Sequence, residues 1–420
     1  MGHIYLKSQK KMINKFSKCF LTGTKIPVVL NFGKMPIANK FHKNYNEKVT
    51  YFNMSLSFNK KYCLAQLSNA PSPKKLFNKE YAFLSSTSKN MENHFKRAAL
   101  EIKNQFRGKK ISVLEIGCND GIFLKNFKNE DHIGIEPASN VANIARRKKI
   151  KVLNTFLNLK AVKKFKLENK FDCIYSANVI CHIKNLREIF SSVKKMLKKN
   201  GYFIFEDPYL GDILEKGSYD QIYDEHIYYF SGTSVQKIAR DHGLILVDAK
   251  KLETHGGSMR YYMTNNINKK KTERLLSILG NEKRKMFDSI SSLYKFKKKI
   301  IMLKDNFYYK LTKLNKEKKE VYGYGATSKS STILHFCNIN NNLIKGIFDN
   351  SKTKINKFSP GKKIKIIDHK KINKLNVKYC ILFAWNHYKE IMNKEKKKKI
   401  IWISHLSNTA FDKKYSKNII

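Results

Sequence analysis

The sequence predicts an α/β protein with a central doubly wound parallel sheet, a small N-terminal cap and a second, smaller α/β unit. Two observations support this fold class. Short apolar runs alternate with amphipathic helical patterns through the middle of the chain, from residue 87 to residue 263. A strand-like run followed by a glycine turn and a helix occurs at residues 113–124 and again at residues 319–336. Such alternation predicts a parallel sheet whose ligand binds beyond the carboxyl ends of its strands.

The first expected element is a cap over residues 1–78. This segment is poorly periodic, contains strand-like pieces at residues 28–30 and 51–56, and is interrupted by prolines. A helix is expected next, over residues 87–107, because apolar side chains recur on one face at helical spacing.

The central domain is expected over residues 79–265. Its strands are expected at residues 113–116, 133–136, 151–153, 171–176, 201–206, 244–248 and 260–263, and its helices at residues 138–148, 186–198 and 233–242. Residues 266–318 are lysine-rich and predict a helical connector or helical hairpin with a solvated charged face. The second α/β unit then occupies residues 319–420.

This second unit repeats the order of strand, glycine turn, helix and acidic strand end. Gly323 and Gly325 lie in its turn, and Asp349 ends its second strand. The helix N-terminus after the turn could hold a nucleotide or a phosphate. The repeat could equally be structural only, and the sequence leaves both interpretations open.

The charge is strongly positive, since 84 Lys+Arg against 33 Asp+Glu give a formal net charge of +51 at pH 7. Such a balance favours nucleic acid or an anionic surface as a partner. However, lysine, asparagine and isoleucine are over-represented together, as in products of AT-rich genomes, the lysines are scattered, and arginine is scarce. We therefore expect compositional bias and no nucleic-acid partner. A phosphate-bearing small substrate is compatible with either explanation.

Seven cysteines lie far apart in the 420 residues. An odd, dispersed set in a chain of this length predicts reduced thiols and a cytoplasmic protein. No apolar run approaches the length of a membrane span, so we expect none. The basic N-terminus, where either Met1 or Met12 could be the start, lacks the apolar core of a signal peptide.

The first glycine turn is the stretch around which we expect the chemistry to be arranged. Gly117 and Gly121 lack a Cβ, so the backbone there can turn sharply and approach a ligand closely. The next strand ends at Glu136, whose carboxylate could accept two hydrogen bonds from a ribose diol. Because the dinucleotide pattern G-x-G-x-x-G is absent, the spacing resembles instead the S-adenosylmethionine (SAM) site of class I methyltransferases. The alternative is an ordinary α/β turn.

The cofactor-binding residues expected from this resemblance are Glu115, Gly117, Asn119, Asp120, Gly121 and Glu136, with the backbone of Ala177 and Asn178 at the methionine end.

Two polar clusters follow expected strand ends. In a SAM fold the residues after the fourth strand face the methyl donor, so His182 is expected near the transferred methyl group. Tyr223, Glu225 and His226 fall within one short loop. A carboxylate beside an imidazole can orient it and raise its basicity, and a tyrosine can hydrogen-bond a developing enolate oxygen. This combination suits C-methylation, which requires a carbanion; the alternatives are a metal site or structural histidines.

Residues 254–260 contain two glycines followed by a hydroxyl group and an arginine. His255, Gly256 and Arg260 are therefore candidate substrate-binding residues, which could hold a phosphate or shape the wall of the cleft. The alternative is a glycine turn before the last strand, and the sequence does not separate the two.

Taken together, these residues resemble the SAM-dependent sugar C-methyltransferases, a family that acts on nucleotide-linked ketosugars. The matching stretches are residues 29–39, 84–88, 115–121, 178–182, 223–226, 255–258, 322–326 and 385–386. The family combines an N-terminal zinc-binding module, a central class I methyltransferase domain with a Rossmann-like doubly wound sheet, and a C-terminal Rossmann-like domain. The resemblance implies that Tyr223, Glu225, His226 and His182 surround the sugar carbon, with His226 as the base, and that Tyr81 contributes to substrate binding.

One departure from the family concerns its metal. The family holds zinc with two C-x-x-C pairs, whereas here Cys19 is followed by Thr22, and the second pair falls on Asn59 and Tyr62, with Cys63 one residue later. One or two thiolates do not make a closed tetrahedral site. We therefore expect no zinc or other metal, and a cap held by packing alone.

The sequence thus predicts a deoxysugar-biosynthesis enzyme that transfers a methyl group from SAM to a sugar carbon next to a carbonyl. One rival is an RNA methyltransferase, which the charge favours. Such an enzyme would carry an Asn/Asp-Pro-Pro-aromatic turn after the fourth strand, and this turn is absent because residues 178–181 read Asn-Val-Ile-Cys. The other is a non-catalytic SAM-fold scaffold of a glycan-assembly pathway. Such a scaffold would tolerate loss of the histidines and glutamate that are present here.

Overall fold

The computed structural model describes residues 15–72, 84–87, 89–407, 410–417 and 419–420. Contacts between residues divide the chain into two compact units. The terminal unit comprises Met1–Ala70, Leu210–Tyr228 and Ser289–Ile420, and the central unit comprises Pro71–Tyr209 and Tyr229–Asp288. The segment that carries Tyr223 and His226 therefore groups with the two ends of the chain.

The central unit is built on a seven-stranded sheet with the strand order β11-β12-β9-β8-β5-β6-β7. Its strands are β5 (Ser112–Ile116), β6 (Asp131–Ile135), β7 (Val152–Leu153), β8 (Phe171–Ala177), β9 (Leu197–Pro208), β11 (Ile245–Leu252) and β12 (Ser258–Thr264). The five strands from β7 to β9 are parallel, as the sequence predicts. β12 differs, because it runs antiparallel to both β9 and β11. The connection over residues 253–257 is too short for the crossover that parallel neighbours need.

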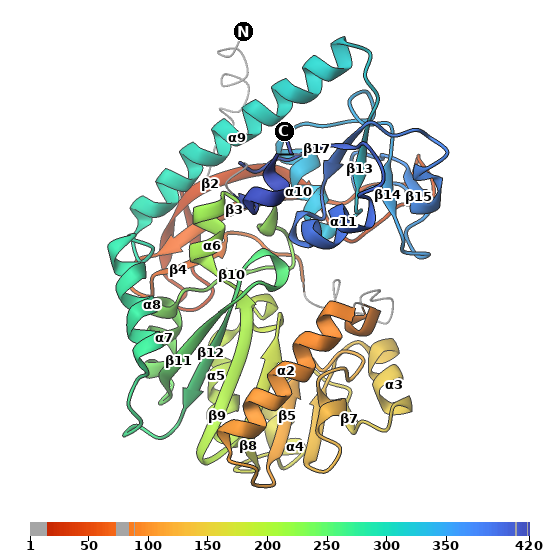
Figure 1. Cartoon of the computed structure of the whole chain (residues 1–420). Helices are drawn as coiled ribbons and strands as arrows, with labels where there is room; N and C mark the ends of the chain where they lie inside the picture. The colour runs from red at the N-terminus through yellow and green to blue at the C-terminus, as the bar shows by residue number, and fades with distance from the viewer. Residues whose placement is uncertain (1–14, 73–83, 88, 408–409, 418) are drawn as a thin grey trace. The chain divides into compact units, whose positions relative to one another are not determined.

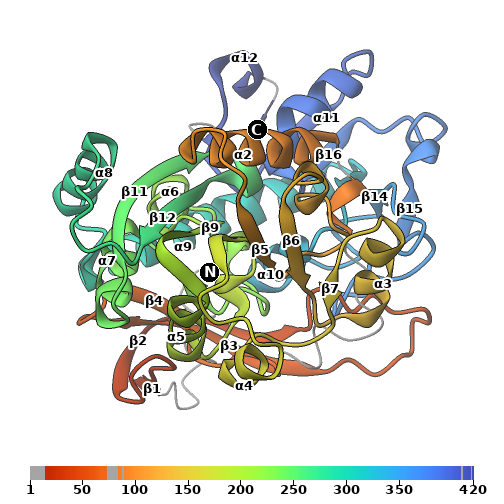
Figure 2. The ribbon, with the colours of Figure 1, turned by 90° about the horizontal axis from the view of Figure 1, so that it is seen from below.

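Helices cover both faces of this sheet, with α2 on one face and α4 and α5 on the other (Figure 2). The helices are α2 (Lys89–Gln105), α3 (Ser139–Arg147), α4 (Leu159–Lys164), α5 (Leu186–Met196), α7 (Gly232–Asp241) and α8 (Glu273–Arg284). α2 buries the face that the sequence predicts, and Phe95 on it packs near Phe123 and Tyr175. The rings of Phe123 and Tyr175 stack with centroids 3.9 Å apart. This aromatic core packs α2 against the strand ends that carry the first glycine turn.

The terminal unit contains an N-terminal sheet with the order β1-β2-β3-β4-β10. Its strands are β1 (Phe16–Lys18), β2 (Lys25–Pro36), β3 (Tyr51–Asn59), β4 (Leu64–Leu67) and β10 (Tyr228–Tyr229). β1 to β4 are joined antiparallel in sequence order. The backbone N–H of Leu67 donates to the carbonyl oxygen of Ile227 at 2.8 Å, so this sheet also holds the end of the His226 loop.

The positions where the family carries zinc ligands are linked here by hydrogen bonds. The Asn59 side-chain amide donates to the Cys19 sulfur at 3.1 Å, and its Oδ1 accepts from the Tyr62 backbone N–H at 3.1 Å. Cys63 adopts a positive φ of 50°, and its thiol donates to the Lys60 carbonyl. Side-chain hydrogen bonds therefore supplement the packing that the sequence predicts for this module.

The rest of the terminal unit is a five-stranded parallel sheet, β15-β14-β13-β16-β17, with its helices. The strands are β13 (Val321–Tyr324), β14 (Ile347–Asp349), β15 (Ile366–Asp368), β16 (Tyr379–Leu382) and β17 (Ile401–Ile403). The helices are α6 (Leu210–Lys216), α9 (Ile290–Lys316), α10 (Ser328–Phe336), α11 (Tyr388–Lys394) and α12 (Lys413–Ser416). This is the second α/β unit expected from the repeated glycine turn.

The lysine-rich stretch over residues 266–318 forms two helices, α8 and α9, which belong to different units. α9 is the long helix near the top of Figure 1. It buries one apolar stripe, which includes Leu293, Phe296, Ile300, Leu303, Phe307 and Leu311. Among the helices in the described part of the chain, none combines the length and apolar character needed to cross a membrane.

Candidate active site

The glycine turn after β5 is strained in the way that only glycine tolerates. Gly117 and Gly121 have φ values of 71° and 78°. A Cβ on Gly117 would lie 2.4 Å from Cγ2 of Val179, and one on Gly121 would lie 2.9 Å from Cγ1 of Ile150. Both glycines are therefore required by backbone conformation and by packing within the protein. The turn brings the end of β5 directly against the loop after β8.

Glu136, at the end of β6, is tied to this turn. Its Oε2 accepts a hydrogen bond from the backbone N–H of Asn119 at 3.0 Å, and its Oε1 accepts from Ala138 at 2.9 Å. Asn119 in turn accepts from the backbone N–H of Ser85 at 2.9 Å through its side chain. Burial raises the pKa of Glu136, and the two backbone donors oppose that shift. Each carboxylate oxygen keeps a further acceptor position, so the predicted contact with a ribose diol is chemically available.

Two more carboxylates lie beside the turn, at Glu115 and Asp120, and both are buried. Asp120 pairs with the ammonium of Lys148 at 3.0 Å. Burial, followed by the charges of Asp120, Glu136 and Glu206, raises the pKa of Glu115 well above its ordinary value. Within the described residues, Glu115 Oε2 has no hydrogen-bond donor. Buried carboxylates of this kind favour a cationic ligand, which would lower the cost of their burial.

The loop after β8 holds Asn178 and His182, as the sequence predicts. Asn178 has a φ of 55°, and its backbone N–H donates to the Glu206 carbonyl at 2.7 Å. His182 ends a short 3₁₀ turn (Ile180–His182), and burial lowers its pKa to about 4, so the imidazole is neutral at pH 7. Asp207 caps the same turn, because its carboxylate accepts from the Cys181 backbone N–H at 2.9 Å. Burial raises the pKa of Asp207 to about 8.

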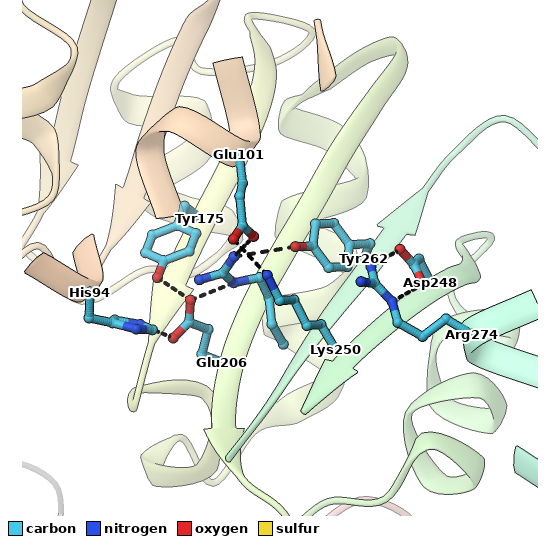
Figure 3. Close-up of polar contacts among 9 residues, drawn as sticks. His94, Glu101, Tyr175, Glu206, Asp248, Lys250, Tyr262 and Arg274 are labelled. Atoms are coloured by element: carbon cyan, nitrogen blue, oxygen red, sulfur yellow. Dashed lines mark hydrogen bonds and ion pairs between the residues drawn. The ribbon is translucent and has the colours of Figure 1, made fainter. Parts of the chain in front are cut away.

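A buried polar network lies beneath these strand ends (Figure 3). The Glu206 carboxylate accepts from His94 Nε2 at 2.6 Å, from the Tyr175 hydroxyl at 2.6 Å and from Arg260 Nε at 2.7 Å. Arg260 also contacts Glu101 at 2.5 Å. Burial alone would raise the pKa of Glu206, but Arg260 and His94 lower it to about 2. The guanidinium of Arg260 is thus buried between two carboxylates, and this position gives no support to the predicted contact with a substrate.

Two other predicted substrate-binding residues lie in a turn at the edge of the central sheet. His255 and Gly256 lie in a 3₁₀ turn (Thr254–Gly256) between β11 and β12, with positive φ values of 55° and 90°. This is the glycine turn that the sequence offered as an alternative, and a role toward substrate stays a prediction. Tyr81 lies outside the described residues.

In the terminal unit, the loop over residues 219–226 brings Tyr223 and His226 together. The Tyr223 hydroxyl lies 2.8 Å from His226 Nε2, and His226 Nδ1 lies 3.1 Å from the Gln221 carbonyl oxygen. A carbonyl oxygen only accepts, so Nδ1 carries the proton and Nε2 accepts from the tyrosine. All three side chains are buried. With the proton on Nδ1, the lone pair of Nε2 lies on the side of Tyr223.

Glu225 has a different partner from the one that the sequence predicts. It accepts a hydrogen bond from the Asn39 side-chain amide at 2.6 Å, and Asn39 accepts from the Ser328 hydroxyl at 2.9 Å. Burial raises the pKa of Glu225, and the Asn39 donor opposes that shift. The Gln221 carbonyl contacts Nδ1 and contributes to the orientation of the imidazole.

Two neighbouring carboxylates anchor this loop to distant parts of the terminal unit. Asp220 accepts from the Trp385 indole N–H at 2.6 Å and lies 3.0 Å from His405 Nε2. Asp224 accepts from the Ala38 backbone N–H at 3.2 Å. Burial, with the adjacent charge of Glu225, raises the pKa of Asp224 to about 8. The stretches around Asn39 and Trp385 both belong to the family resemblance, and that was the only sequence signal for these anchoring roles.

The second glycine turn repeats the arrangement of the first. Gly325 has a φ of 88°, and Asp349 at the end of β14 accepts from the Ala326 backbone N–H at 2.8 Å and from Ser351 at 2.8 Å. Glu136 makes the equivalent pair of contacts in the central unit. The ammonium of Lys354 donates to the Ala326 carbonyl at 2.9 Å. The repeat is thus structural in detail, and a phosphate-binding role for it stays open.

Comparisons with known proteins match both parts of the chain. Residues 89–249 match a family model described as a methyltransferase domain, and residues 253–403 match one described as a C-methyltransferase C-terminal domain. The C-methyltransferase NovU of Streptomyces niveus is 24% identical over 375 residues, which are 88% of this chain and 89% of NovU.

Solved structures of methyltransferases are also similar to part of the chain. A possible histamine N-methyltransferase of Thermotoga maritima is 20% identical, with 42% of this chain and 92% of that chain covered and a TM-score of 0.34. The magnesium protoporphyrin IX methyltransferase of Synechocystis PCC 6803 with bound SAM is 12% identical, with 42% and 79% covered and a TM-score of 0.33.

Proposed function

Since this chain is a class I SAM-dependent C-methyltransferase, we propose that it methylates a carbon next to the carbonyl group of a nucleotide-linked ketosugar. The single observation that carries the proposal is the contact between Tyr223 and His226 Nε2 at 2.8 Å. C-methylation requires removal of a proton from carbon, and a neutral histidine beside a phenol supplies a base and an acid in one place.

The cofactor side fits SAM on a separate observation. Glu115 presents a buried carboxylate oxygen without a donor among the described residues, next to the strained turn at Gly117. A ligand that carries both an ammonium and a sulfonium group suits this negative environment. Glu136 is the residue that would hold the ribose, and the loop after β8 would hold the methionine end. Bound SAM supplies an electrophilic methyl group to the substrate carbanion.

The protein's own residues perform the proton transfer. His226 Nε2 takes the proton from the substrate carbon, and the electron pair of the broken C–H bond becomes the enolate. The enolate oxygen accepts the hydrogen bond that the Tyr223 hydroxyl otherwise gives to Nε2, which frees the imidazole lone pair for the proton. The Gln221 carbonyl keeps Nδ1 protonated throughout. After methyl transfer, the imidazolium releases its proton to solvent.

Glu225 and Asn39 contribute the third polar group of this loop. A glutamate with a raised pKa and a single amide donor is suited to a hydrogen bond with a sugar hydroxyl. The excess of lysine is compatible with a substrate diphosphate. Seven free, buried cysteines support a cytoplasmic location.

The experiment that tests the proposal separates proton removal from methyl transfer. Nucleotide-linked 4-ketosugars are incubated in D₂O without SAM, and exchange at the carbon next to the carbonyl is followed by NMR. The wild type should exchange that proton, and His226→Ala should not. His132→Ala, which removes a partly buried histidine of β6 in the central unit, is the matched control and should behave as wild type. With labelled SAM, label should then appear on the same carbon.

One observation favours a second function, namely the formal net charge of +51. An RNA methyltransferase would bind RNA with a steep dependence on salt. If total RNA is labelled while every ketosugar fails to exchange or to accept label, the sugar proposal is wrong. If SAM binds but neither substrate class reacts, the non-catalytic scaffold is the better description.

A further inference from the structure

Helix α9 (Ile290–Lys316) carries a second apolar stripe that stays exposed among the described residues. Its exposed members are Tyr294 (46%), Ile301 (42%), Met302 (58%), Tyr308 (40%) and Tyr309 (67%). With about 100° between successive residues of a helix, these positions gather on the side opposite the buried stripe of Leu293, Ile300 and Phe307. Single exposed apolar residues are ordinary, but five on one face of one helix indicate an interaction surface.

Two oppositely charged residues lie within this stripe. Asp305 is the one acidic residue of α9, whose other charged residues are all lysines. Its neighbours three and four positions away on the helix are Ile301, Met302, Tyr308 and Tyr309, so no lysine of the same helix faces it. Within the part of the chain that the structure describes, no ion pair forms at Asp305 or Lys298, and both are exposed.

The order of these residues is self-complementary about the point between Ile301 and Met302. Lys298 and Asp305 lie at equal distances on either side of that point, and so do Tyr294 and Tyr309. When two identical helices pack antiparallel about a two-fold axis there, Ile301 meets Met302 of the other copy. Lys298 meets Asp305 and Tyr294 meets Tyr309, each pair occurring twice. Residue i contacting j while j contacts i is the defining property of an isologous interface.

We propose that the occupant of this face is a second copy of the chain, packed antiparallel along α9. The two Lys298–Asp305 pairs are the argument for a second copy, because the antiparallel arrangement satisfies all four charges at once. The stripe from Tyr294 to Tyr309 spans about 22 Å at 1.5 Å per residue. One helix pair of this length buries less than the roughly 1,200 Å² of a standard interface, so we expect a reversible dimer.

The test is sedimentation equilibrium of the full-length protein at fixed ionic strength, since the high net charge of each copy opposes association. The wild type should show a monomer–dimer equilibrium. Asp305→Lys and Lys298→Asp each place like charges in contact twice, and should weaken the dimer by about tenfold or more. The double variant with both substitutions restores two opposite-charge pairs and should recover the affinity of the wild type.

Lys313→Asp is the matched control for Lys298→Asp, because it makes the same charge change on α9 at an exposed position beyond the stripe. It should leave the dimer unchanged, and circular dichroism should show that all variants fold. As an independent readout, Met302→Cys lies next to the two-fold axis and should form an intermolecular disulfide on mild oxidation. The seven native cysteines are buried and do not compete.

Three results would overturn the proposal. These are a wild type that stays monomeric up to its solubility limit, single variants that dimerise as well as the wild type, and a double variant that fails to recover. Phosphatidylserine vesicles provide the comparison with a lipid surface. A monomer that sediments with these vesicles, and releases them after Tyr309→Ser, would identify the stripe as a membrane-binding face and not a dimer interface.

Discussion

The Tyr223 hydroxyl donates a hydrogen bond to His226 Nε2 at 2.8 Å, while the Gln221 carbonyl fixes the proton of the same imidazole on Nδ1. The base and the acid of the proposed reaction are thus in contact before substrate binds. This relationship depends on a backbone carbonyl and one side chain, both within the same short loop. It gives the proposed mechanism its most direct test.

We expect Tyr223→Phe to lower kcat about 100-fold, because the enolate oxygen loses its donor while His226 remains. Affinity for SAM should be unchanged, since Glu115 and Glu136 lie in the central unit. Single-turnover methyl transfer and calorimetric SAM titration measure the two effects. Tyr45→Phe removes a hydroxyl from an exposed tyrosine and is the control. A Tyr223→Phe enzyme with wild-type kcat would exclude the phenol from the reaction.

The fold and the first glycine turn could be predicted from the sequence because their signals are local. Gly117, Gly121 and Glu136 lie within a short stretch, and their spacing alone places a turn and an acid at adjacent strand ends. The antiparallel pairing of β12 was missed, since apolar runs carry no direction. Only the short connection at residues 253–257 indicates that β12 runs antiparallel to β11.

The partners within the candidate site could not be predicted, because they join residues that are far apart in the chain. Asn39 and Glu225 are separated by 186 positions. The Gln221 carbonyl is a backbone group that any residue would supply, so no side-chain pattern reveals it. Arg260 was assigned to substrate because an arginine after two glycines suits a phosphate. Its actual partner, Glu206, lies on the neighbouring strand β9, where Arg260 and Glu206 stand opposite each other.

Asn39→Asp tests whether Asn39 controls the charge of Glu225. The substitution replaces a donor at 2.6 Å by a second carboxylate of the same shape, so the pair must share a proton and its pKa must rise. A carboxyl group whose pKa is raised in the folded state stabilises that state only while it is protonated. The free energy of unfolding and the activity should therefore both fall as pH rises from 6 to 8. Urea denaturation at both pH values should show a loss of about 2 kcal/mol at the higher one.

Ser328→Ala is the control for this change. It removes the outer hydrogen bond to Asn39 and leaves the amide contact to Glu225 in place. The loss in free energy of unfolding should be about 1 kcal/mol and should not vary with pH. If the two variants behave alike at pH 6 and pH 8, Asn39 has no special effect on Glu225.

The contribution of Asp207 to the free energy of unfolding should decrease as pH rises. Its pKa is raised by burial from 3.8 to about 8, so between these values the folded state binds a proton that the unfolded state has released. Stability from this group therefore falls with pH, by up to about 1.4 kcal/mol per unit. Asp207→Asn keeps an acceptor for the Cys181 N–H and should remove this slope. Thermal melts of both proteins from pH 5 to pH 8 measure the difference.

The control for the Asp207 prediction is Asp172, a carboxylate whose pKa is shifted in the opposite direction. Burial would raise the pKa of Asp172, but Lys198 and Ser112 outweigh it and lower that pKa. Its contribution is therefore present at neutral pH and is lost only in acid. Asp172→Asn should flatten the stability curve below pH 4 and leave it parallel to that of the wild type above pH 5. An Asp207→Asn protein whose melting temperature still tracks the wild type at every pH would show that Asp207 is ionised in the fold.

Arg260→Met separates an internal role of the arginine from the predicted contact with substrate. Without the guanidinium, the Glu206 carboxylate keeps only His94 and Tyr175 as partners in a buried position, and we expect a loss of about 3–5 kcal/mol. The pKa of Glu206, lowered to about 2 in the wild type, should rise toward its ordinary 4.5. The stability that the ionised Glu206 carboxylate contributes is lost only near pH 2 in the wild type. In Arg260→Met it should be lost at a higher pH.

Arg274→Met is the matched control for this last change. Arg274 pairs with Asp248 at the protein surface, where removal of an ion pair costs about 1 kcal/mol or less. Acid denaturation followed by circular dichroism should move its midpoint upward for Arg260→Met and leave it in place for Arg274→Met. Variant protein that remains folded at low temperature should bind the nucleotide-sugar with unchanged KM. A stable Arg260→Met protein with a strongly raised KM would instead show that Arg260 contributes to substrate binding.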